Sequence, residues 1–344
     1  MYILAESDYK ETNWYKRILA PMKAEARRKR IRLCEGTASD GLPAGEVCAF
    51  LIGGSERWIL DTARALRARG CHPILLNEID GARLSGRYSR VRSDYGSLVA
   101  SLAARGGKCA LYGVNPASVS DVARREAFLG VAPRGEVFEN RGSLARCFED
   151  FWARHLLSRF DNVICANDFA AVSLYQRLRE RGAEESVTLT VQASGEILGY
   201  FPAIQTVTVD PTALSAAAFE IADCIRAHPD FIGVSIAVEF SEHPQNPDPT
   251  VQSPLDASDA LTSDSFYGDP EMAELLRIEQ LLSSLDETDR KILHLLSDGC
   301  RAIGEEAFLS DNGVKYRIKK MKQCLGVDSG REIPAVLEKY GIRV

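Results

Sequence analysis

Short apolar runs alternate with longer amphipathic stretches through the first two thirds of the chain. Runs such as VCAFLIGG, CALYGV and NVICAN predict strands. The stretches 58–69, 119–129 and 169–181, in which hydrophobic positions recur every three to four residues, predict helices. About ten strands alternate in this way with helices, which predicts parallel sheets covered on both faces. We therefore expect an α/β fold of two doubly wound sheets, with a ligand crevice at the carboxyl ends of the strands.

The pattern changes in the last third of the chain. Residues 244–270 are rich in Pro, Ser and Asp and have no apolar period, which is typical of an exposed linker. Four helical segments follow, namely EMAELLRIEQLLSSL, DETDRKILHLLSDG, SDNGVKYRIKKMKQCLGVDS and REIPAVLEKYGI. We predict an α/β unit over residues 1–243, a linker over 244–270 and a small all-α unit over 271–344.

Composition and charge limit the classes of function. The 344 residues carry a net charge of −6, so any nucleic-acid contact must come from a local basic patch. No run approaches the roughly 18 apolar residues of a membrane helix, and the start, MYILAESDYK, does not read as a secretory signal. The nine cysteines lack the close spacing of a zinc or redox site. These features predict a soluble cytoplasmic protein with reduced thiols, no metal and no membrane partner.

Sequence motifs of common enzymes are missing. The chain has no G-x-G-x-x-G, G-x-x-x-x-G-K, G-x-S-x-G or H-E-x-x-H, and its five histidines are isolated in the sequence. We therefore predict no enzymatic activity and no cofactor. The segment LIGGSERW leaves two interpretations open: a glycine-rich loop that binds phosphate, or a tight strand-to-helix turn with Ser55 as the N-cap.

The most specific pattern of the first unit is FDNVICANDFAAVSLYQRLRERG, residues 160–182. An apolar strand ends in Ala166-Asn167-Asp168, and an amphipathic helix begins at once. Asp168 thus lies at the carboxyl end of a strand and the amino end of a helix. A carboxylate in this position caps the helix or accepts hydrogen bonds from a polar ligand, and both roles remain open.

This segment resembles the effector-binding domain of lac/galactose-repressor-type regulators, which has the type I periplasmic-binding-protein fold. The segments 89–130 and 202–228 agree with that family in order and spacing, so the resemblance covers about residues 1–240. It implies a two-lobed sensor for a small polar ligand such as a sugar. The helix-turn-helix with which such regulators usually begin is not expected here, because YILA at residues 2–5 already reads as the first strand.

The resemblance implies ligand-binding roles for particular residues. Asp168 would bind ligand hydroxyls, and Arg124, in an R-x-x-A-F version of the family's R-x-x-G-F motif, would bind the ligand across the cleft. A carboxylate and a guanidinium can hold a polyol by charge-assisted hydrogen bonds, whereas the alternative makes Arg124 a surface charge. Asn13, Trp14 and Tyr15 follow the first strand, where an aromatic ring stacks on a sugar or packs at a helix start. The family's G-Y-D is replaced by ASGEILGYFP, so the ligand class stays open.

The helical unit contains a locally basic segment. From Asp311 to Cys324 there are five basic residues and one acid. An apolar stripe of one helix face is formed by Val314, Ile318, Met321 and Leu325.

The segment and its surroundings resemble a LuxR-type helix-turn-helix over about residues 280–344. The matching positions are Leu285, Gly299, Ser310, Val314, Lys315, Leu325-Gly326-Val327, Ser329, Arg331 and Glu332. The resemblance implies a helix in the major groove of DNA, with Asn312, Lys315, Tyr316 and Lys319 near base edges or phosphates and Arg317 and Lys320 near phosphates. Two features depart from the family. The segment from Gly299 to Ser310 is about two residues shorter than in the family. Gly313 replaces the usual threonine, and glycine in a helix costs about 1 kcal/mol relative to alanine.

Together these features predict a ligand-responsive, DNA-binding transcription regulator. A small polar ligand would bind in the amino-terminal sensor, and a homodimer would place its carboxyl-terminal helices on double-stranded DNA. The alternative is a cytoplasmic binding or scaffold protein whose last helices mediate association only. A flexible linker transmits orientation poorly, so control by dimerisation is as compatible with the sequence as a rigid lever.

Overall fold

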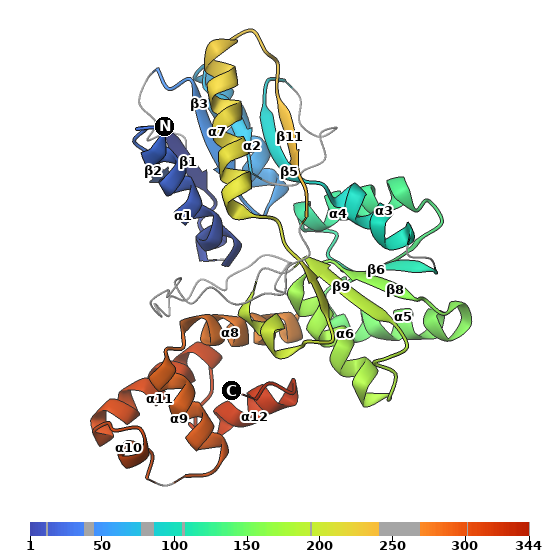
Figure 1. Ribbon diagram of the computed structural model, residues 1–344, viewed down its shortest axis with the longest axis vertical. Coiled ribbons are helices and arrows are strands. Elements are labelled where there is room, and N and C mark those ends of the chain that lie inside the picture. Colours follow the sequence, from blue (N-terminus) through green and yellow to red (C-terminus); the bar gives the residue numbers. More distant parts are fainter. Residues whose placement is uncertain are drawn as a thin grey trace.

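The protein consists of two α/β lobes and a group of helices at the carboxyl end (Figure 1). The computed structural model describes residues 1–11, 13–37, 45–76, 86–104, 107–192, 195–240, 269–300 and 302–343. Most of the predicted linker, residues 244–268, lies outside the described residues.

Lobe 1 is built on a six-stranded sheet in the order β11-β5-β4-β3-β1-β2, and its strand pairs are parallel. The strands are β1 (Tyr2–Ala5), β2 (Cys34–Gly36), β3 (Cys48–Ile52), β4 (His72–Leu75), β5 (Ser89–Ser93) and β11 (Ser235–Val238). The helices are η1 (Asp8–Glu11), α1 (Asn13–Arg28), α2 (Glu56–Ala68) and α7 (Pro211–Ala227). Helices α1 and α7 share one core with the sheet, and α2 packs in a second core. Strand β3 is buried at every position, as expected of a central strand covered on both faces.

Lobe 2 contains a five-stranded parallel sheet in the order β10-β9-β8-β6-β7. Its strands are β6 (Cys109–Val114), β7 (Glu136–Glu139), β8 (Asn162–Cys165), β9 (Thr188–Gln192) and β10 (Gln205–Val207). Its helices are α3 (Tyr95–Ala104), α4 (Val119–Val131), α5 (Leu144–Ser158), α6 (Asp168–Glu180) and the short η4 (Glu196–Tyr200). The predicted doubly wound α/β architecture is confirmed, because α3 and α4 share one core with this sheet while α5 and α6 share another.

The carboxyl-terminal helices form the helical unit, residues 269–343. They are α8 (Pro270–Ser284), α9 (Glu287–Ser297), α10 (Ile303–Glu306), α11 (Asp311–Leu325) and α12 (Glu332–Lys339). Helix α10 has only four residues, in agreement with the short segment between Gly299 and Ser310. Helix α11 starts at Ser310, whose hydroxyl accepts a hydrogen bond from the Gly313 amide (3.2 Å), and ends at Gly326 with a left-handed φ of 71°. Val314, Met321 and Leu325 of the predicted stripe are buried.

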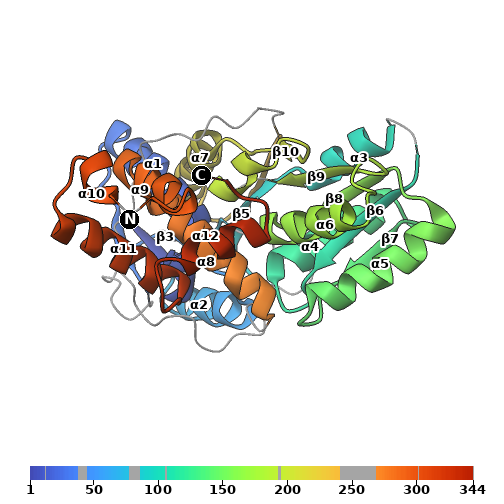
Figure 2. The ribbon, with the colours of Figure 1, turned by 90° about the horizontal axis from the view of Figure 1, so that it is seen from below.

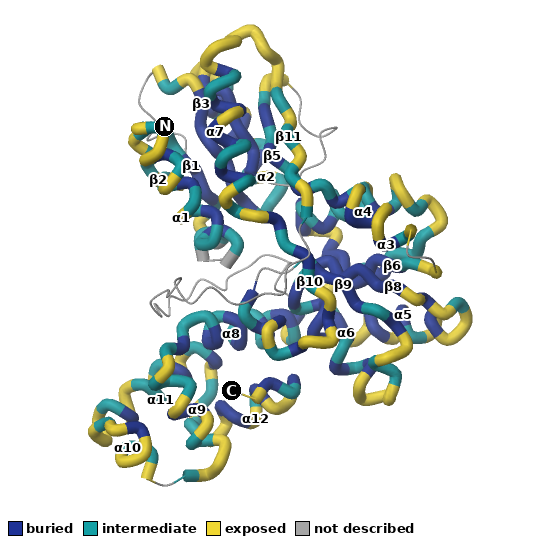
Figure 3. Tube along the Cα trace, in the orientation of Figure 1, coloured by how far each residue is buried: buried dark blue, intermediate teal, exposed yellow. Residues whose placement is uncertain are grey.

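Helix α8 joins the helical unit to lobe 2. Its Met272, Leu275 and Ile278 are fully buried and belong to the same hydrophobic core as Phe151 and Leu174 of lobe 2. Seen from below, α8 and α12 lie in the middle of the molecule, with lobe 2 extending to the right (Figure 2). Buried positions continue from the sheets into α8, whereas the edge around α10 is largely exposed (Figure 3). The helical unit and lobe 2 are therefore one packed body.

Two further properties concern membrane helices and cysteines. Among the residues described above, no helix combines the length and apolar character needed to cross a membrane. All nine cysteines are free thiols, four of them buried and five half-buried.

Candidate functional site

Arg124 and the β8–α6 segment meet at the carboxyl edge of the lobe 2 sheet. The Arg124 guanidinium, which comes from α4, donates hydrogen bonds to the backbone oxygen of Ala166 and to the side-chain oxygen of Gln192 (3.1 Å). It also forms an ion pair with Asp121 (3.3 Å), and its side chain is only 14% exposed. Arg124 is therefore not a solvated surface charge. Arg124 therefore lies beside the end of β8, at Ala166, which precedes Asp168 by two residues, and beside the end of β9, at Gln192.

Asp168 is not the N-cap of α6. Asn167 is the cap, because its side-chain oxygen accepts a hydrogen bond from the Ala170 amide (2.9 Å). Asp168 is instead the first helical residue and is buried, with 5% of its surface exposed. A carboxylate in the first turn of a helix is stabilised by the helix dipole. Asp168 follows by two residues the backbone oxygen of Ala166, to which Arg124 donates, so the two segments bring a carboxylate and a guanidinium to the same edge of the sheet. Both groups can form charge-assisted hydrogen bonds with a hydroxylated ligand.

Two residues of this edge were missed by sequence reasoning. Asp121 accepts a hydrogen bond from the Asn115 amide (3.0 Å) and holds Arg124 from the same helix. Its position three residues before Arg124 was the available signal, because such pairs share a helix face. Gln192 ends β9 without any sequence motif, and only the parallel pairing of β8 with β9 brings it to Arg124.

A third carboxylate reaches this edge from the helical unit. Glu279 of α8 is 3% exposed, and it accepts hydrogen bonds from the backbone amides of Glu196 (2.9 Å) and Ile197 (2.7 Å) and from the Ser283 hydroxyl (2.8 Å). Burial raises its pKa to about 7, the hydrogen bonds oppose this rise, and the charge of Asp168 adds to it. The sequence signal was a carboxylate within the apolar face of a helix, between Ile278 and Leu282.

Of the lobe 1 residues that the resemblance assigns to ligand binding, Tyr15 lies in the hydrophobic core instead. Tyr15 is buried in the lobe 1 core and its hydroxyl donates to Glu35 (3.0 Å). Burial, followed by the charge of Glu35, raises the Tyr15 pKa. This ring has no free face for a sugar, so we assign it to packing. Trp14 is half-buried against the same core, and the side chain of Asn13 lies outside the described residues.

The LIGGSERW segment forms the strand-to-helix turn of the second interpretation. The amides of Gly54 and Ser55 donate to one oxygen of Glu6 (2.7 and 2.9 Å), and the Ser55 hydroxyl donates to the other. Ser55 is the N-cap by position, but its side chain makes no capping hydrogen bond. An internal carboxylate thus fills the place that a phosphate would take in the first interpretation.

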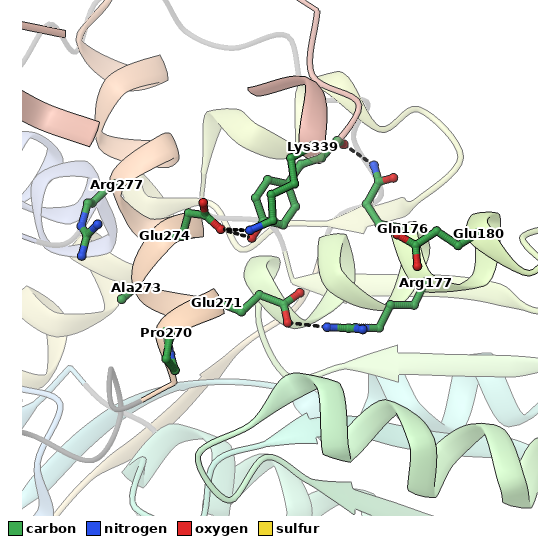
Figure 4. Close-up of a pocket in the computed structure, with 10 residues that line it drawn as sticks. Gln176, Arg177, Glu180, Pro270, Glu271, Ala273, Glu274, Arg277 and Lys339 are labelled. Carbon is green, nitrogen blue, oxygen red and sulfur yellow. Dashed lines mark hydrogen bonds and ion pairs between the residues drawn. The ribbon is translucent and has the colours of Figure 1, made fainter. Parts of the chain in front are cut away.

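A separate pocket lies between lobe 2 and the helical unit (Figure 4). Its volume is about 660 Å³, and its charged lining comes from α6, α8 and α12, namely Arg177, Glu180, Glu271, Glu274, Arg277 and Lys339. Arg177 pairs with Glu271 (2.6 Å), and Lys339 pairs with Glu274. The Tyr340 hydroxyl also donates to Glu274 (2.6 Å). These contacts connect α6 to α8 and α8 to the end of α12.

The residues predicted to contact DNA divide into two groups. Asn312, Lys315, Tyr316 and Lys319 are exposed on α11, and the Lys320 ammonium lies 5.6 Å from the centre of the Tyr316 ring. Arg317 instead binds Asp286 and Asp289 at the start of α9, both at 2.7 Å. The open face of α11 is therefore formed by the first group and Lys320, whereas Arg317 fixes α11 to α9.

Replacing Arg317 with alanine is expected to lower the free energy of unfolding by about 1 kcal/mol at neutral pH, because these partly exposed ion pairs are screened by water. Burial opposes ionisation of Asp286, but the Arg317 hydrogen bond and further donors outweigh it and lower the Asp286 pKa below its usual 3.8. A lowered pKa gives stability that is present above pH 3.8 and disappears as the pH falls through the folded-state value. Urea unfolding at pH 7 and pH 3 measures how far the substitution lowers the free energy of unfolding at each pH. An equal loss at both pH values would contradict the prediction.

Comparisons with known proteins identify the fold. No family model matches the sequence, and no curated protein matches it. Among solved structures, the chain is similar to the transcriptional regulator CelR in complex with cellobiose, at 14% identity and a TM-score of 0.54, over 70% of this chain and 81% of that one. It is similar to GanP, a glucose-galactose binding protein from Geobacillus stearothermophilus, at 12% identity and a TM-score of 0.54, over 70% and 96%. It is also similar to a LacI family transcriptional regulator from Enterococcus faecalis with bound ribose, at 15% identity and a TM-score of 0.51, over 70% and 96%. The two lobes therefore have the type I periplasmic-binding-protein-like fold.

Proposed function

We propose that the protein is a sugar-responsive, DNA-binding transcription regulator. The observation that carries this proposal is that Arg124 binds Gln192 and the backbone oxygen of Ala166, two residues before Asp168, at the carboxyl edge of a sheet. The fold of that sheet is shared with proteins that have bound sugars. Open α/β sheets bind their ligands at this edge. A guanidinium, a carboxylate and a carboxamide offer the mixture of donors and acceptors that sugar hydroxyls need.

The DNA-binding half of the proposal rests on helix α11. Its exposed lysines, Lys315 and Lys319, are one helical turn apart, and Lys320 stands next to them over the Tyr316 ring. Lysines in such a row neutralise phosphates, which is the main source of affinity for DNA. Since the helical unit shares its core with lobe 2, the sensor is attached to α11 through packed side chains as well as through the linker.

Sugar binding is expected to raise the thermal midpoint of the full chain. A hit among D-ribose, D-glucose and cellobiose, present at about one hundred times its dissociation constant, should raise the midpoint by about 5 °C. In Asp168→Asn the shift should disappear, because the carboxylate that accepts the hydroxyl hydrogens is lost. Asp150→Asn on the exposed face of α5 removes a carboxyl group from the same lobe and should keep the shift. An undiminished shift in Asp168→Asn would contradict the assignment.

The second candidate is a ligand-binding protein whose helical unit mediates association only. It is favoured by the exposure of two aromatic residues of the helical unit, Phe308 between α10 and α11 at 88% and Tyr316 on α11 at 62%. Exposed aromatic rings are common in interfaces between proteins. Sedimentation of Phe308→Ser separates the candidates, since this substitution would dissociate an assembly held by the ring and would leave a DNA-bound dimer of sensor lobes intact.

A further inference from the structure

A run of basic residues lies at the end of helix α1 in lobe 1. Residues 27–32 read RRKRIR and contain five basic side chains and no acid, in a chain whose net charge is −6. The run begins in the last turn of α1 and continues to Arg32, whose backbone oxygen accepts a hydrogen bond from the Met1 ammonium (3.1 Å). In Figure 1, N marks Met1 in the upper part of the molecule, whereas α11 lies at its lower end. The run is therefore a basic segment separate from that of α11.

Acidic side chains near the run already have basic partners within it. Glu25, one turn before the end of α1, binds Arg28 (2.5 Å). Glu220 and Asp223 of α7 both bind Lys29 (3.1 and 2.6 Å). These contacts neutralise Arg28 and Lys29 and fix the end of α1 to α7, so they explain two of the five basic residues by the fold alone.

Three guanidinium groups of the run have no such explanation. Arg27, Arg30 and Arg32 are exposed, and their side chains form no hydrogen bond or ion pair with any residue that the structure describes. The Glu46 carboxylate comes near Arg32, but it binds the Met1 ammonium (3.3 Å). We call Arg27, Arg30 and Arg32 the basic end of lobe 1. Together they present three positive charges to solvent within six residues.

Arg30 occupies a backbone position that suits glycine. Its φ is 56°, in the left-handed region. The Arg30 amide donates to the Arg27 oxygen (3.0 Å) and the Ile31 amide to the Ala26 oxygen (2.8 Å), which is the pattern in which helices commonly end on a glycine. Four other helices of the chain, α2, α6, α9 and α12, are followed by a glycine with positive φ, namely Gly70, Gly182, Gly299 and Gly341. A side chain in this conformation lowers stability, and that of Arg30 has no polar contact in the described fold to offset the loss. Such a position points to contact with a partner.

We propose that the basic end of lobe 1 is a second DNA-binding surface, which contacts the phosphates of duplex DNA independently of α11. Guanidinium groups match phosphate oxygens by paired, charge-assisted hydrogen bonds. Residues 27–37, all of which the structure describes, include no exposed large apolar side chain. The surface therefore has no ring on which an unpaired base could stack and no apolar group to enter a membrane. Its contacts fit the outside of a duplex and carry no base sequence preference.

Fluorescence anisotropy of the full chain with a labelled duplex over a salt series tests the proposal. Arg27→Gln with Arg32→Gln should lower the affinity about tenfold at 0.1 M salt and make the slope of log affinity against log salt shallower by about two. Arg57→Gln with Arg64→Gln on α2 is the control, since it removes the same charge from exposed positions. Equal losses in the two double variants, or an unchanged slope, would overturn the proposal.

Arg30 allows a test in which stability and binding change in opposite directions. Arg30→Gly should keep the thermal midpoint of the chain or raise it by about 1 °C, because glycine accepts the left-handed conformation, while the affinity for DNA falls about threefold. Arg30→Lys keeps the charge and should keep most of the affinity. If Arg30→Gly binds DNA as tightly as the unaltered protein, Arg30 only ends a helix and the proposal fails.

The surface is distinguished from α11 by combining the variants. In a Lys315→Glu/Lys319→Glu background, Arg27→Gln with Arg32→Gln should lower the remaining affinity by a similar factor. Loss of affinity on changing the arginines but not the lysines would leave this surface and remove the role of α11. Loss on changing the lysines alone would overturn the present proposal, as would no DNA binding by the unaltered chain. Arginine variants that lose binding to phosphatidylglycerol vesicles but not to DNA would assign the surface to membranes and overturn it as well.

Discussion

Reversing the charges of Lys315 and Lys319 together is expected to reduce the affinity of the full chain for duplex DNA by about 100-fold at 0.1 M salt. Both side chains are exposed on α11, so the loss should come from phosphate contacts and not from unfolding. The slope of log affinity against log salt concentration should become shallower by about two, one for each lost contact. Fluorescence anisotropy with a labelled duplex over a salt series measures both quantities.

The matched control is Arg57→Glu with Arg64→Glu on α2 of lobe 1. This pair is also exposed, with side chains 94% and 72% accessible, and changes the net charge by the same amount. It should leave both the affinity and the salt slope nearly unchanged. Equal losses in the two double variants would show that overall charge, and not α11, determines DNA binding. No binding by the unaltered protein even at low salt would favour the association candidate.

Much of the architecture was predictable because hydrophobic periodicity is local. Strand β3, which is buried at every position, and helix α6, which has an N-cap, can each be recognised from a few residues of sequence. The stripe of Val314, Met321 and Leu325 is local in the same sense. Asp168 and Arg124 were singled out because each lies in a recognisable motif, and the hydrogen bond from Arg124 to the backbone oxygen of Ala166 joins their two segments. Their binding of a ligand stays a prediction.

The rest depended on contacts between distant segments. Gln192 meets Arg124 only through strand pairing, and Glu279 reaches the β9 loop from a helix that the sequence assigns to another unit. Two predicted ligand or DNA residues, Tyr15 and Arg317, have acidic partners that periodicity does not reveal: Glu35, twenty residues away from Tyr15, and the Asp286 and Asp289 pair. An exposed linker in the sequence also suggested a loosely attached helical unit. The apolar face of α8 fits a core contact equally well, and only the fold shows which surface it covers.

Shortening Met272 and Leu275 together to alanine is expected to lower the free energy of unfolding by about 5 kcal/mol. Both side chains are fully buried, and the Met272 sulfur accepts a hydrogen bond from Asn140 at the end of β7 (3.0 Å). Domains are stable by only about 5–15 kcal/mol, so this loss would leave the junction between lobe 2 and the helical unit barely formed. Urea unfolding followed by circular dichroism measures the change.

Gln280→Ala is the control on the same helix, since Gln280 is only half-buried and alanine favours a helix. If lobe 2 and the helical unit are one folding body, the double variant should lower the midpoint of both together, and amides in α6 and α9 should lose protection in parallel. Loss confined to α9–α12 would instead mean that the helical unit unfolds by itself. In that case α11 would be attached to the sensor only by the linker, and a signal from Asp168 would have to act through dimerisation, because no packed helix would remain to carry it.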